Sequence, residues 1–408
     1  MMTKNNKERV AVIGAGIAGL YMAKLLLAKG YDVSLFEASA RIGGRIKGYQ
    51  FDDITVDLGG EWLHQFNDNP NSLTGIIEDA GQAYRSISNY NDHQNNNEET
   101  KADPKQVESF INYIQNTPFK LDVQLSETIR NFSGDPALKT YFDTALVDMA
   151  SSTENFSTKE FIHLLPALEP SDYELKDTSM SSFIHNYFSD IPKQRIYLST
   201  PIKVICYDQE SVALTTEEGK KLDFAHAIIA VPISQLKNNS IKFVPQLSHE
   251  KRLAIQKIGM GTGLKAFFFF EEKILKKSAF AQQYAPYYIE KKIGKYTVII
   301  TIIMGHYAKK YYENPVTYQE GMLDELATLA GRNLRPLLKS TKFQDWSKEP
   351  FIEGTYSFPM LGEGNAREVA SSPIKNRIFF IGEAMNTNYA YGFIHGALET
   401  AEKVNEFF

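Results

Sequence analysis

The chain has 408 residues, of which 43% are hydrophobic and 23% are charged, and its 44 Lys and Arg against 49 Asp and Glu give a net charge of −5. This length can bury a large core and suggests roughly two to three domains. The acidic balance argues against a nucleic-acid-binding protein. A single cysteine, Cys206, excludes an internal disulfide and a multi-cysteine metal site. Neither a membrane-spanning apolar run nor a signal-peptide pattern is present, so we expect a cytoplasmic protein without a membrane anchor.

The first structured segment is predicted to be a βαβ unit. An apolar strand at Arg9–Ile13 leads into a glycine-rich turn. Residues 18–29 then have the apolar spacing of a helix, which Gly30 ends, and residues 31–37 form a second strand. This order of elements predicts an α/β fold whose first domain is a doubly wound parallel sheet.

The turn in this unit has the GxGxxG spacing of a dinucleotide-binding loop. Gly14 allows the tight turn, Gly16 lets a pyrophosphate approach the backbone, and Gly19 lets the helix pack closely on the strand. Glu37, at the end of the second strand, can accept hydrogen bonds from both hydroxyls of an adenosine ribose. An acid at this position disfavours the 2′-phosphate of NADP.

A second loop follows, in which two glycines stand between two arginines. Arg41 and Arg45 flank this loop, and Gly44 brings its backbone close to the phosphates that the first loop would bind. NAD enzymes of the simple Rossmann type have no such element here.

The rest of the chain alternates between helical and strand-rich blocks. Residues 88–103 are polar and asparagine-rich, which predicts a long surface loop. Helical patterns dominate residues 105–188. Strands are predicted at 195–207, 211–216, 224–230, 263–270, 295–304 and 377–381, and helices at 318–330 and 392–407. This alternation indicates two domains threaded through each other.

Taken together, these motifs resemble the flavin-dependent amine oxidase family, which includes monoamine, polyamine and L-amino-acid oxidases. Their order is that of the family over residues 9–408, and the polyamine oxidases resemble the chain best. Besides the two glycine loops, the matching segments are 57–64 (DLGGEWLH), 230–233 (AVPI), 259–265 (GMGTGLK), Trp346, 354–357 (GTYS), 382–383 (GE) and 392–397 (GFIHGA).

The resemblance implies a Rossmann-type FAD-binding domain interleaved with an α+β substrate domain that contains a mixed sheet. We expect the FAD-binding domain at residues 1–66, 193–240 and 350–408, and the substrate domain at 67–192 and 241–349. Animal monoamine oxidases carry a flavin-linking cysteine where this chain has Thr355, so the resemblance implies noncovalent FAD.

The resemblance also assigns further residues to the cofactor. Gly59, Gly60 and Glu61 would lie near the flavin end, and Val204 would contact the adenine through its backbone. Gly382 and Glu383 would serve the ribityl-pyrophosphate region. The helix after Gly392 and Phe393 would point its N-terminus at the flavin pyrimidine carbonyl, which agrees with the anion-binding character of a helix start.

Lys265 is the first catalytic candidate, because the family has a lysine here that holds a water against the reactive flavin nitrogen. The alternative is an edge lysine that reaches to water. Tyr356 and Phe393 would form two aromatic walls beside the flavin, with Tyr391 as a rival for the second wall. His64 would border a substrate tunnel, and a structural role remains its alternative.

The sequence therefore predicts an FAD-dependent amine oxidase that converts an amine to an imine and then an aldehyde, with hydrogen peroxide as co-product. Its partners would be a polyamine or monoamine and oxygen, and neither a metal nor a nucleic acid is expected. An L-amino-acid oxidase is the first alternative, although no arginine follows Gly60 to bind a carboxylate. A flavin desaturase also remains, while a histone-demethylase role is not expected. An FAD-binding interaction protein without turnover is a further alternative, because the chain departs from the family pattern: residues 177–182 lack the expected glycines, the spacing from Glu383 to Phe393 is about one residue longer, and Phe393 stands where tyrosine is common.

Overall fold

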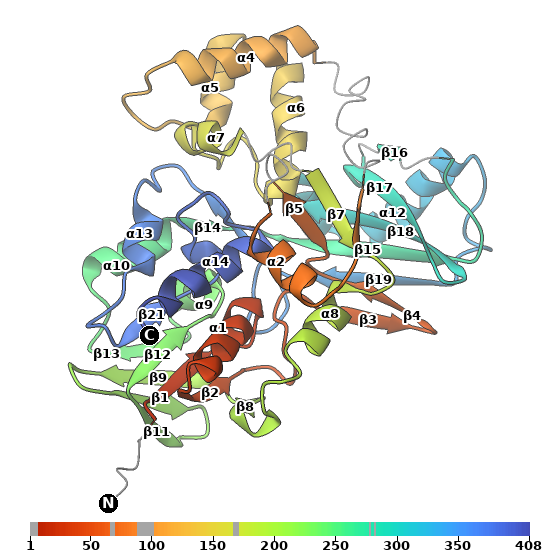
Figure 1. Ribbon diagram of the computed structural model, residues 1–408. Coiled ribbons are helices and arrows are strands. Elements are labelled where there is room, and N and C mark those ends of the chain that lie inside the picture. The colour runs from red at the N-terminus through yellow and green to blue at the C-terminus, as the bar shows by residue number, and fades with distance from the viewer. Residues whose placement is uncertain (1–6, 66–69, 88–101, 166–170, 277–278, 281–282) are drawn as a thin grey trace, which may run out of the picture.

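A computed structural model describes residues 7–65, 70–87, 102–165, 171–276, 279–280 and 283–408 (Figure 1). The surface loop expected at residues 88–103 lies outside the described residues, except that Ala102 and Asp103 lead into a helix. None of the helices in the described ranges is long and apolar enough to cross a membrane.

A parallel five-stranded sheet contains the βαβ unit predicted from the sequence. Its order is β21-β12-β1-β2-β8, and every neighbouring pair is parallel. Helix α1 (Ile17–Ala28) connects β1 to β2. The strands come from distant parts of the chain: β1 (Arg9–Ile13), β2 (Asp32–Phe36), β8 (Ile196–Tyr197), β12 (His226–Ile229) and β21 (Ile378–Phe380).

Both faces of this sheet are buried, because alternate residues of β1 enter two different cores. Val10 and Val12 pack with helices on one face, whereas Ala11 and Ile13 pack with the other core. The first face is covered by α1, α2 (Ser72–Asp79), α8 (Met180–Tyr187) and α14 (Ile394–Asn405). The second is covered by α9 (Ile233–Lys237), α10 (His249–Lys257), α13 (Ala366–Ser371) and a mixed sheet, β11 (Lys221–Phe224), β10 (Val212–Thr216), β9 (Ile202–Tyr207) and β13 (Lys242–Val244).

A second large sheet carries the lysine singled out in the sequence. Its described pairings are all antiparallel, with β15 in the interior of the order β16-β17-β18-β15-β19. The strands are β15 (Gly263–Phe270), β16 (Ala279–Phe280), β17 (Tyr287–Ile293), β18 (Tyr296–Met304) and β19 (Ser340–Asp345). One face packs on α11 (Gly305–Glu313) and α12 (Pro315–Ala330), and the other on the hairpin β3 (Gly48–Phe51) and β4 (Ile54–Asp57).

Residues 105–188 are less helical than the sequence predicts. Apart from α8, which packs on the parallel sheet, their helices form a group at the top of Figure 1: α4 (Pro104–Asn116), α5 (Leu125–Phe132), α6 (Pro136–Ala145) and α7 (Thr158–Leu164). The 3-10 turn η1 (Leu146–Met149) follows α6. The segment then contributes β7 (Ser171–Leu175), the middle strand of a sheet with β5 (Trp62–Gln65) and β6 (Tyr84–Ser86). From Asp172 to Leu175 the sequence DYEL alternates polar and apolar residues, a strand signal that we did not use when we predicted helices here.

One predicted strand needs correction. The strand predicted at residues 195–207 is split: the 3-10 turn η3 (Lys193–Arg195) and β8 precede a break, and β9 starts at Ile202. The two strands belong to different sheets. The smaller elements are β14 (Ile258–Met260), β20 (Ser357–Pro359) and the 3-10 turn η4 (Glu383–Met385).

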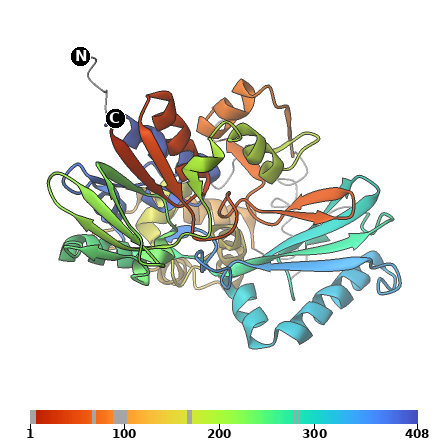
Figure 2. The same ribbon diagram turned by 90° about the horizontal axis from the view of Figure 1, so that it is seen from below.

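The interleaving of two domains remains a proposal, and its boundaries need adjustment. Helices α2 and α8 lie in one core of the parallel sheet, and α10 and β13 belong to the core on the other face. The expected boundaries place all four in the substrate domain. We therefore propose that the FAD-binding domain also includes these elements, which Figure 2 shows from below.

Gly19→Ala should destabilise the fold, whereas Gly16→Ala should not. A Cβ at Gly19 would lie 1.9 Å from the carbonyl oxygen of Gly14, so helix and strand would have to separate, at a cost of about 1–3 kcal/mol. A Cβ at Gly16 meets nothing within 4 Å, and its φ of −68° suits any residue, so the cost should stay below about 1 kcal/mol. Thermal unfolding of the flavin-free variants measures both; equal stability would contradict this account of the turn.

Candidate functional site

A cavity of about 500 Å³ lies at the carboxyl ends of the parallel strands. Ile13, Phe36, Ala230 and Ile381, which follow or end four of these strands, all line it. This edge is where open α/β sheets bind their ligands. The predicted site residues that line it are Gly14, Gly16, Glu37, Arg41, Gly44, Arg45, Gly59, Gly60, Glu61, His64, Lys265, Tyr356, Gly382, Glu383, Gly392 and Phe393.

Gly19 and Val204 do not line the cavity. Gly19 instead forms the close contact between α1 and β1, as its predicted packing role requires. Val204 pairs with strands on both sides, Thr215 of β10 and Lys242 of β13. Its neighbours Ile202 and Lys203 line the cavity. We therefore propose that an adenine would be contacted just before Val204, where β13 has not yet begun.

The glycine positions test whether a dinucleotide fits this cavity. Gly14 has φ +106°, a value that L side chains rarely adopt, and forms the turn. Cβ atoms at Gly16 and Gly382 would meet no atom within 4 Å, so both backbones face open space in the cavity wall. Thr355 also belongs to the cavity lining, and its buried hydroxyl has no hydrogen-bond partner among the described residues. An extended ligand can therefore approach the backbone where the motif predicts it.

Glu37 stands at the end of β2 with its carboxylate oriented by the glycine loop. One oxygen accepts a hydrogen bond from the Ala15 backbone N–H at 2.7 Å. The other accepts from the N–H and the hydroxyl of Ser39, at 2.9 and 2.7 Å. The oxygen bound to Ala15 keeps a lone pair for a ribose hydroxyl. Among the described residues, no Lys or Arg forms an ion pair with Glu37.

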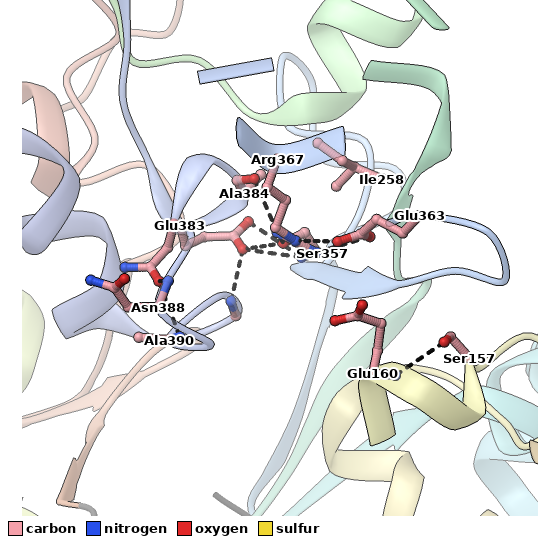
Figure 3. A network of polar contacts seen from close by, with 12 residues as sticks. Ser157, Glu160, Ile258, Ser357, Glu363, Arg367, Glu383, Ala384, Asn388 and Ala390 are labelled. Atoms are coloured by element: carbon pink, nitrogen blue, oxygen red, sulfur yellow. Dashed lines mark hydrogen bonds and ion pairs between the residues drawn. The ribbon is translucent and has the colours of Figure 1, made fainter. Parts of the chain in front are cut away.

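Arg45 joins the N-terminal part of the site to the C-terminal part. Its guanidinium donates to the Thr355 carbonyl at 2.9 Å and pairs with Glu383 at 2.7 Å. Glu383 also accepts from the Ser357 hydroxyl at 2.6 Å and the Gly392 N–H at 2.8 Å (Figure 3). Burial disfavours the charged form of Glu383, but Arg45 and these hydrogen bonds outweigh it and hold its pKa below the usual value.

A second ion pair, Arg367–Glu363, lies next to Glu383 and contacts it through Ser357. Arg367 of α13 donates to the Ser357 hydroxyl at 2.9 Å and the Ala384 carbonyl at 3.0 Å, and it pairs with Glu363 at 2.6 Å (Figure 3). Burial raises the pKa of Glu363 to about 7, against the pull of Arg367. The sequence reasoning missed both residues, because an i, i+4 Glu–Arg pair reads as an ordinary helix surface pair.

Lys265 is buried in the interior strand β15, so the edge-lysine alternative is wrong. It occupies the same face as Phe267 and is only 4% exposed. Its Nζ donates to the carbonyls of Asp57 (3.0 Å) and Gly59 (3.2 Å) and pairs with Glu61 at 3.2 Å. Burial lowers the pKa of Lys265, and Glu61 opposes that shift. A buried basic group thus lines the cavity.

The aromatic wall residues lie on two different elements. Tyr356 lies just before β20, and its hydroxyl donates to Met304 Sδ at 3.3 Å. Phe393 is the N-cap of α14, and both rings line the cavity. Tyr391 also lines it, but its ring lies 3.9 Å from the Arg367 guanidinium and is 2% exposed, so it packs toward the buried network. This favours Phe393 as the second wall.

His64 is held by an acid that the sequence did not single out. Its Nδ1 lies 2.6 Å from Asp172 Oδ1, because β5 and β7 pair these two residues directly. Its ring packs against Phe393 at 5.0 Å, and Asp172 itself lines the cavity. The sequence signal for Asp172 was the strand alternation of β7, which places Asp172 and Glu174 on one face.

Known proteins resemble this chain over most of its length. The model of a family described as "Flavin containing amine oxidoreductase" matches residues 175–406, and that of an NAD(P)-binding Rossmann-like domain matches residues 12–78. Lysine-specific histone demethylase 1 homolog 1 of Arabidopsis thaliana is 24% identical over 95% of this chain and 50% of its own length. Polyamine oxidase 2 of the same plant is 26% identical, over 97% and 87%. The chain thus spans about half the length of the demethylase relatives.

Solved structures share the fold. Putrescine oxidase bound to putrescine has a TM-score of 0.83 at 17% identity, and cyclohexylamine oxidase from Brevibacterium oxydans IH-35A has 0.82 at 15%; each alignment covers 98% of both chains. The Rossmann sheet, the second antiparallel sheet and their connection therefore recur at low identity. Because the family match extends over more than half of the sequence, this chain belongs to the flavin-containing amine oxidoreductases.

Proposed function

We propose that this protein is an FAD-dependent amine oxidase that acts on amines with a second cationic group. The observation that carries this proposal is the buried Lys265, held by two carbonyls and Glu61 in a cavity that also presents aromatic rings and an acid. Buried lysines of this kind are costly unless their basicity is used or fully paired.

The cofactor would be FAD, the flavin of the family to which the chain belongs. The glycine loop at Gly16 would take the pyrophosphate at the start of α1, and Glu37 the adenosine ribose. The cavity wall at Gly382 would take the ribityl region. When bound, FAD accepts a hydride from the amine-bearing carbon and passes the electrons to oxygen. Thr355 offers no thiol, and Cys206 lies in β9 away from the cavity lining, so binding would be noncovalent.

Lys265 would hold and move a proton at its Nζ. Because burial lowers its pKa, Lys265 can release a proton more readily than an exposed lysine and take one up again. Tyr356 and Phe393 would confine the substrate chain between apolar surfaces and keep water away from the reacting carbon.

The charges around the cavity favour an amine over an amino acid. Within the described lining, each Lys or Arg is paired with a carboxylate: Arg41 with Glu349, Arg45 with Glu383, Lys203 with Glu217 and Lys265 with Glu61. A substrate carboxylate would find no unpaired cation there. This supports the amine assignment over the L-amino-acid oxidase alternative.

A second ammonium group would bind at Asp172. This carboxylate is buried in the cavity wall with Phe393, and its side-chain partner is the imidazole of His64, which is not a permanent cation. A diamine or polyamine can supply the missing positive charge.

FAD should be released free when the protein is denatured, and Gly16→Ala should weaken its binding at least tenfold. The added methyl projects into the space that the pyrophosphate needs, while the fold stays intact. Fluorescence titration of the flavin-free protein measures the affinity. Gly75→Ala is the control, because a Cβ at Gly75 also meets nothing within 4 Å and Gly75 does not line the cavity. Flavin that stays with the precipitated chain would contradict noncovalent binding.

Amines should reduce the bound flavin under anaerobic conditions, and L-amino acids should not, because no lining cation is available for a carboxylate. The test is an anaerobic absorbance assay with putrescine, spermidine, cyclohexylamine, a dimethyl-lysine peptide and a series of L-amino acids. Reduction by amino acids alone would overturn the substrate class. Reduction by none of these compounds would favour the interaction protein without turnover.

Asp172→Asn should weaken a diamine about tenfold or more and a monoamine by less than about threefold. The amide keeps an oxygen for His64 but loses the charge that pairs with a distal ammonium, a contact worth about 1.5–3 kcal/mol. Putrescine and n-butylamine form the matched pair, and the concentration dependence of anaerobic flavin reduction gives each apparent affinity. An equal loss for both amines would show that Asp172 does not bind the second ammonium.

A further inference from the structure

Two lysines share the carboxylate beside the candidate catalytic lysine. Lys265 lies 3.2 Å from one oxygen of Glu61, and Lys291 of β17 lies 3.4 Å from the other. Both ammonium groups also lie near the Trp62 ring, at 5.4 and 5.8 Å from its centroid. One carboxylate therefore stands between two ammonium groups, and all three side chains are largely buried.

Lys291 is held in this position from its other side. Its Nζ donates to Glu174 at 2.7 Å, and Arg85 pairs with the same carboxylate at 2.7 Å on the exposed rim. Burial disfavours the charged form of Lys291, but Glu61 and Glu174 outweigh it and raise its pKa. Lys291 is thus a stable cation, and it does not line the cavity.

Lys291 is not needed to neutralise either carboxylate. Without it, Glu61 would still pair with Lys265, and Glu174 would still pair with Arg85. Its effect on Lys265 is instead electrostatic. The positive charge of Lys291 repels that of Lys265, and it offsets part of the attraction between Glu61 and Lys265. The charged groups that face Lys265 are Asp57 and Glu61 after β4 and Lys291 on β17, with Glu174 and Arg85 behind Lys291.

We propose that Lys291 is a positioning residue for Lys265: through Glu61 it makes Lys265 release its proton more readily than a single Lys265–Glu61 ion pair would. The proposal rests on the proposed function for the use of that proton, but the electrostatic link itself does not depend on turnover. It assigns to β17 a part in the chemistry, although no atom of Lys291 reaches the cavity.

Lys291→Met should raise the titration midpoint of Lys265 by about one pH unit, because the repelling charge is lost and Glu61 pairs with Lys265 alone. In the flavin-free protein the midpoint is read by NMR of ¹³C-labelled lysine, with the Lys265 signal identified by its loss in Lys265→Arg. In the FAD-loaded enzyme the pH limb of flavin reoxidation should move in the same direction. Lys291→Arg keeps the charge and should restore the wild-type midpoint.

Lys292→Met is the matched control, since the neighbouring residue on β17 is exposed and donates to the Lys295 carbonyl instead. An unchanged or lowered Lys265 midpoint in Lys291→Met, or an equal rise in Lys292→Met, overturns the proposal. If Lys291→Met does not fold, Lys291→Gln carries the same expectation. Absence of flavin reduction by any amine would defeat the proposed function alone, because the NMR midpoint would still decide the role of Lys291.

Discussion

The ion pair between Arg45 and Glu383 is the interaction on which the site depends. It joins residues 338 positions apart at 2.7 Å, in a place where both charges are largely withdrawn from water. Removing one partner of such a pair leaves a buried charge unpaired, at a cost of about 3–5 kcal/mol. Glu383 also accepts hydrogen bonds from the Gly392 N–H, which precedes Phe393 in the chain, and from the Ser357 hydroxyl. The ion pair therefore connects the loop of Arg45 to the segment that leads to Phe393.

The carboxylates near the cavity differ in their hydrogen-bond and ion-pair partners. Glu349 is held by Lys47 and Arg41, and Glu383 by Arg45, so these acids serve as structural anchors. Glu37 accepts only neutral donors and keeps its charge for a ligand. Asp172 is paired with the imidazole of His64, and no Lys or Arg of the described residues forms an ion pair with it. The distribution of counter-ions therefore separates anchoring acids from binding acids better than burial does, because all of them are buried or half-buried.

The departures from the family pattern noted in the sequence have local structural explanations. The segment before α8 lacks the expected glycines, yet Asp177 adopts φ +58°, which aspartate tolerates better than most residues, and Ser179 caps the helix. The longer spacing from Glu383 to Phe393 is taken up by a turn in which Asn386 accepts from the N–H groups of Asn388 and Ala390. Neither departure disturbs the cavity lining, so neither supports a protein without turnover.

Local sequence patterns predict the parallel sheet and most of the residues that line the cavity. The spacing of Gly14, Gly16 and Gly19 has a local cause, since turn geometry and close packing constrain neighbouring residues, and Glu37 follows at a fixed distance along β2. The apolar run GLKAFFFF is also a local signal, and it predicts β15. The tertiary structure alone decided the partners of Lys265, Asp172 and Lys291. Those contacts join strands that are 100 to 230 residues apart in the chain, and no local pattern encodes which side chains meet across different sheets. Strand pairing likewise shows that Val204 is paired on both sides, whereas Ile202 and Lys203 line the cavity.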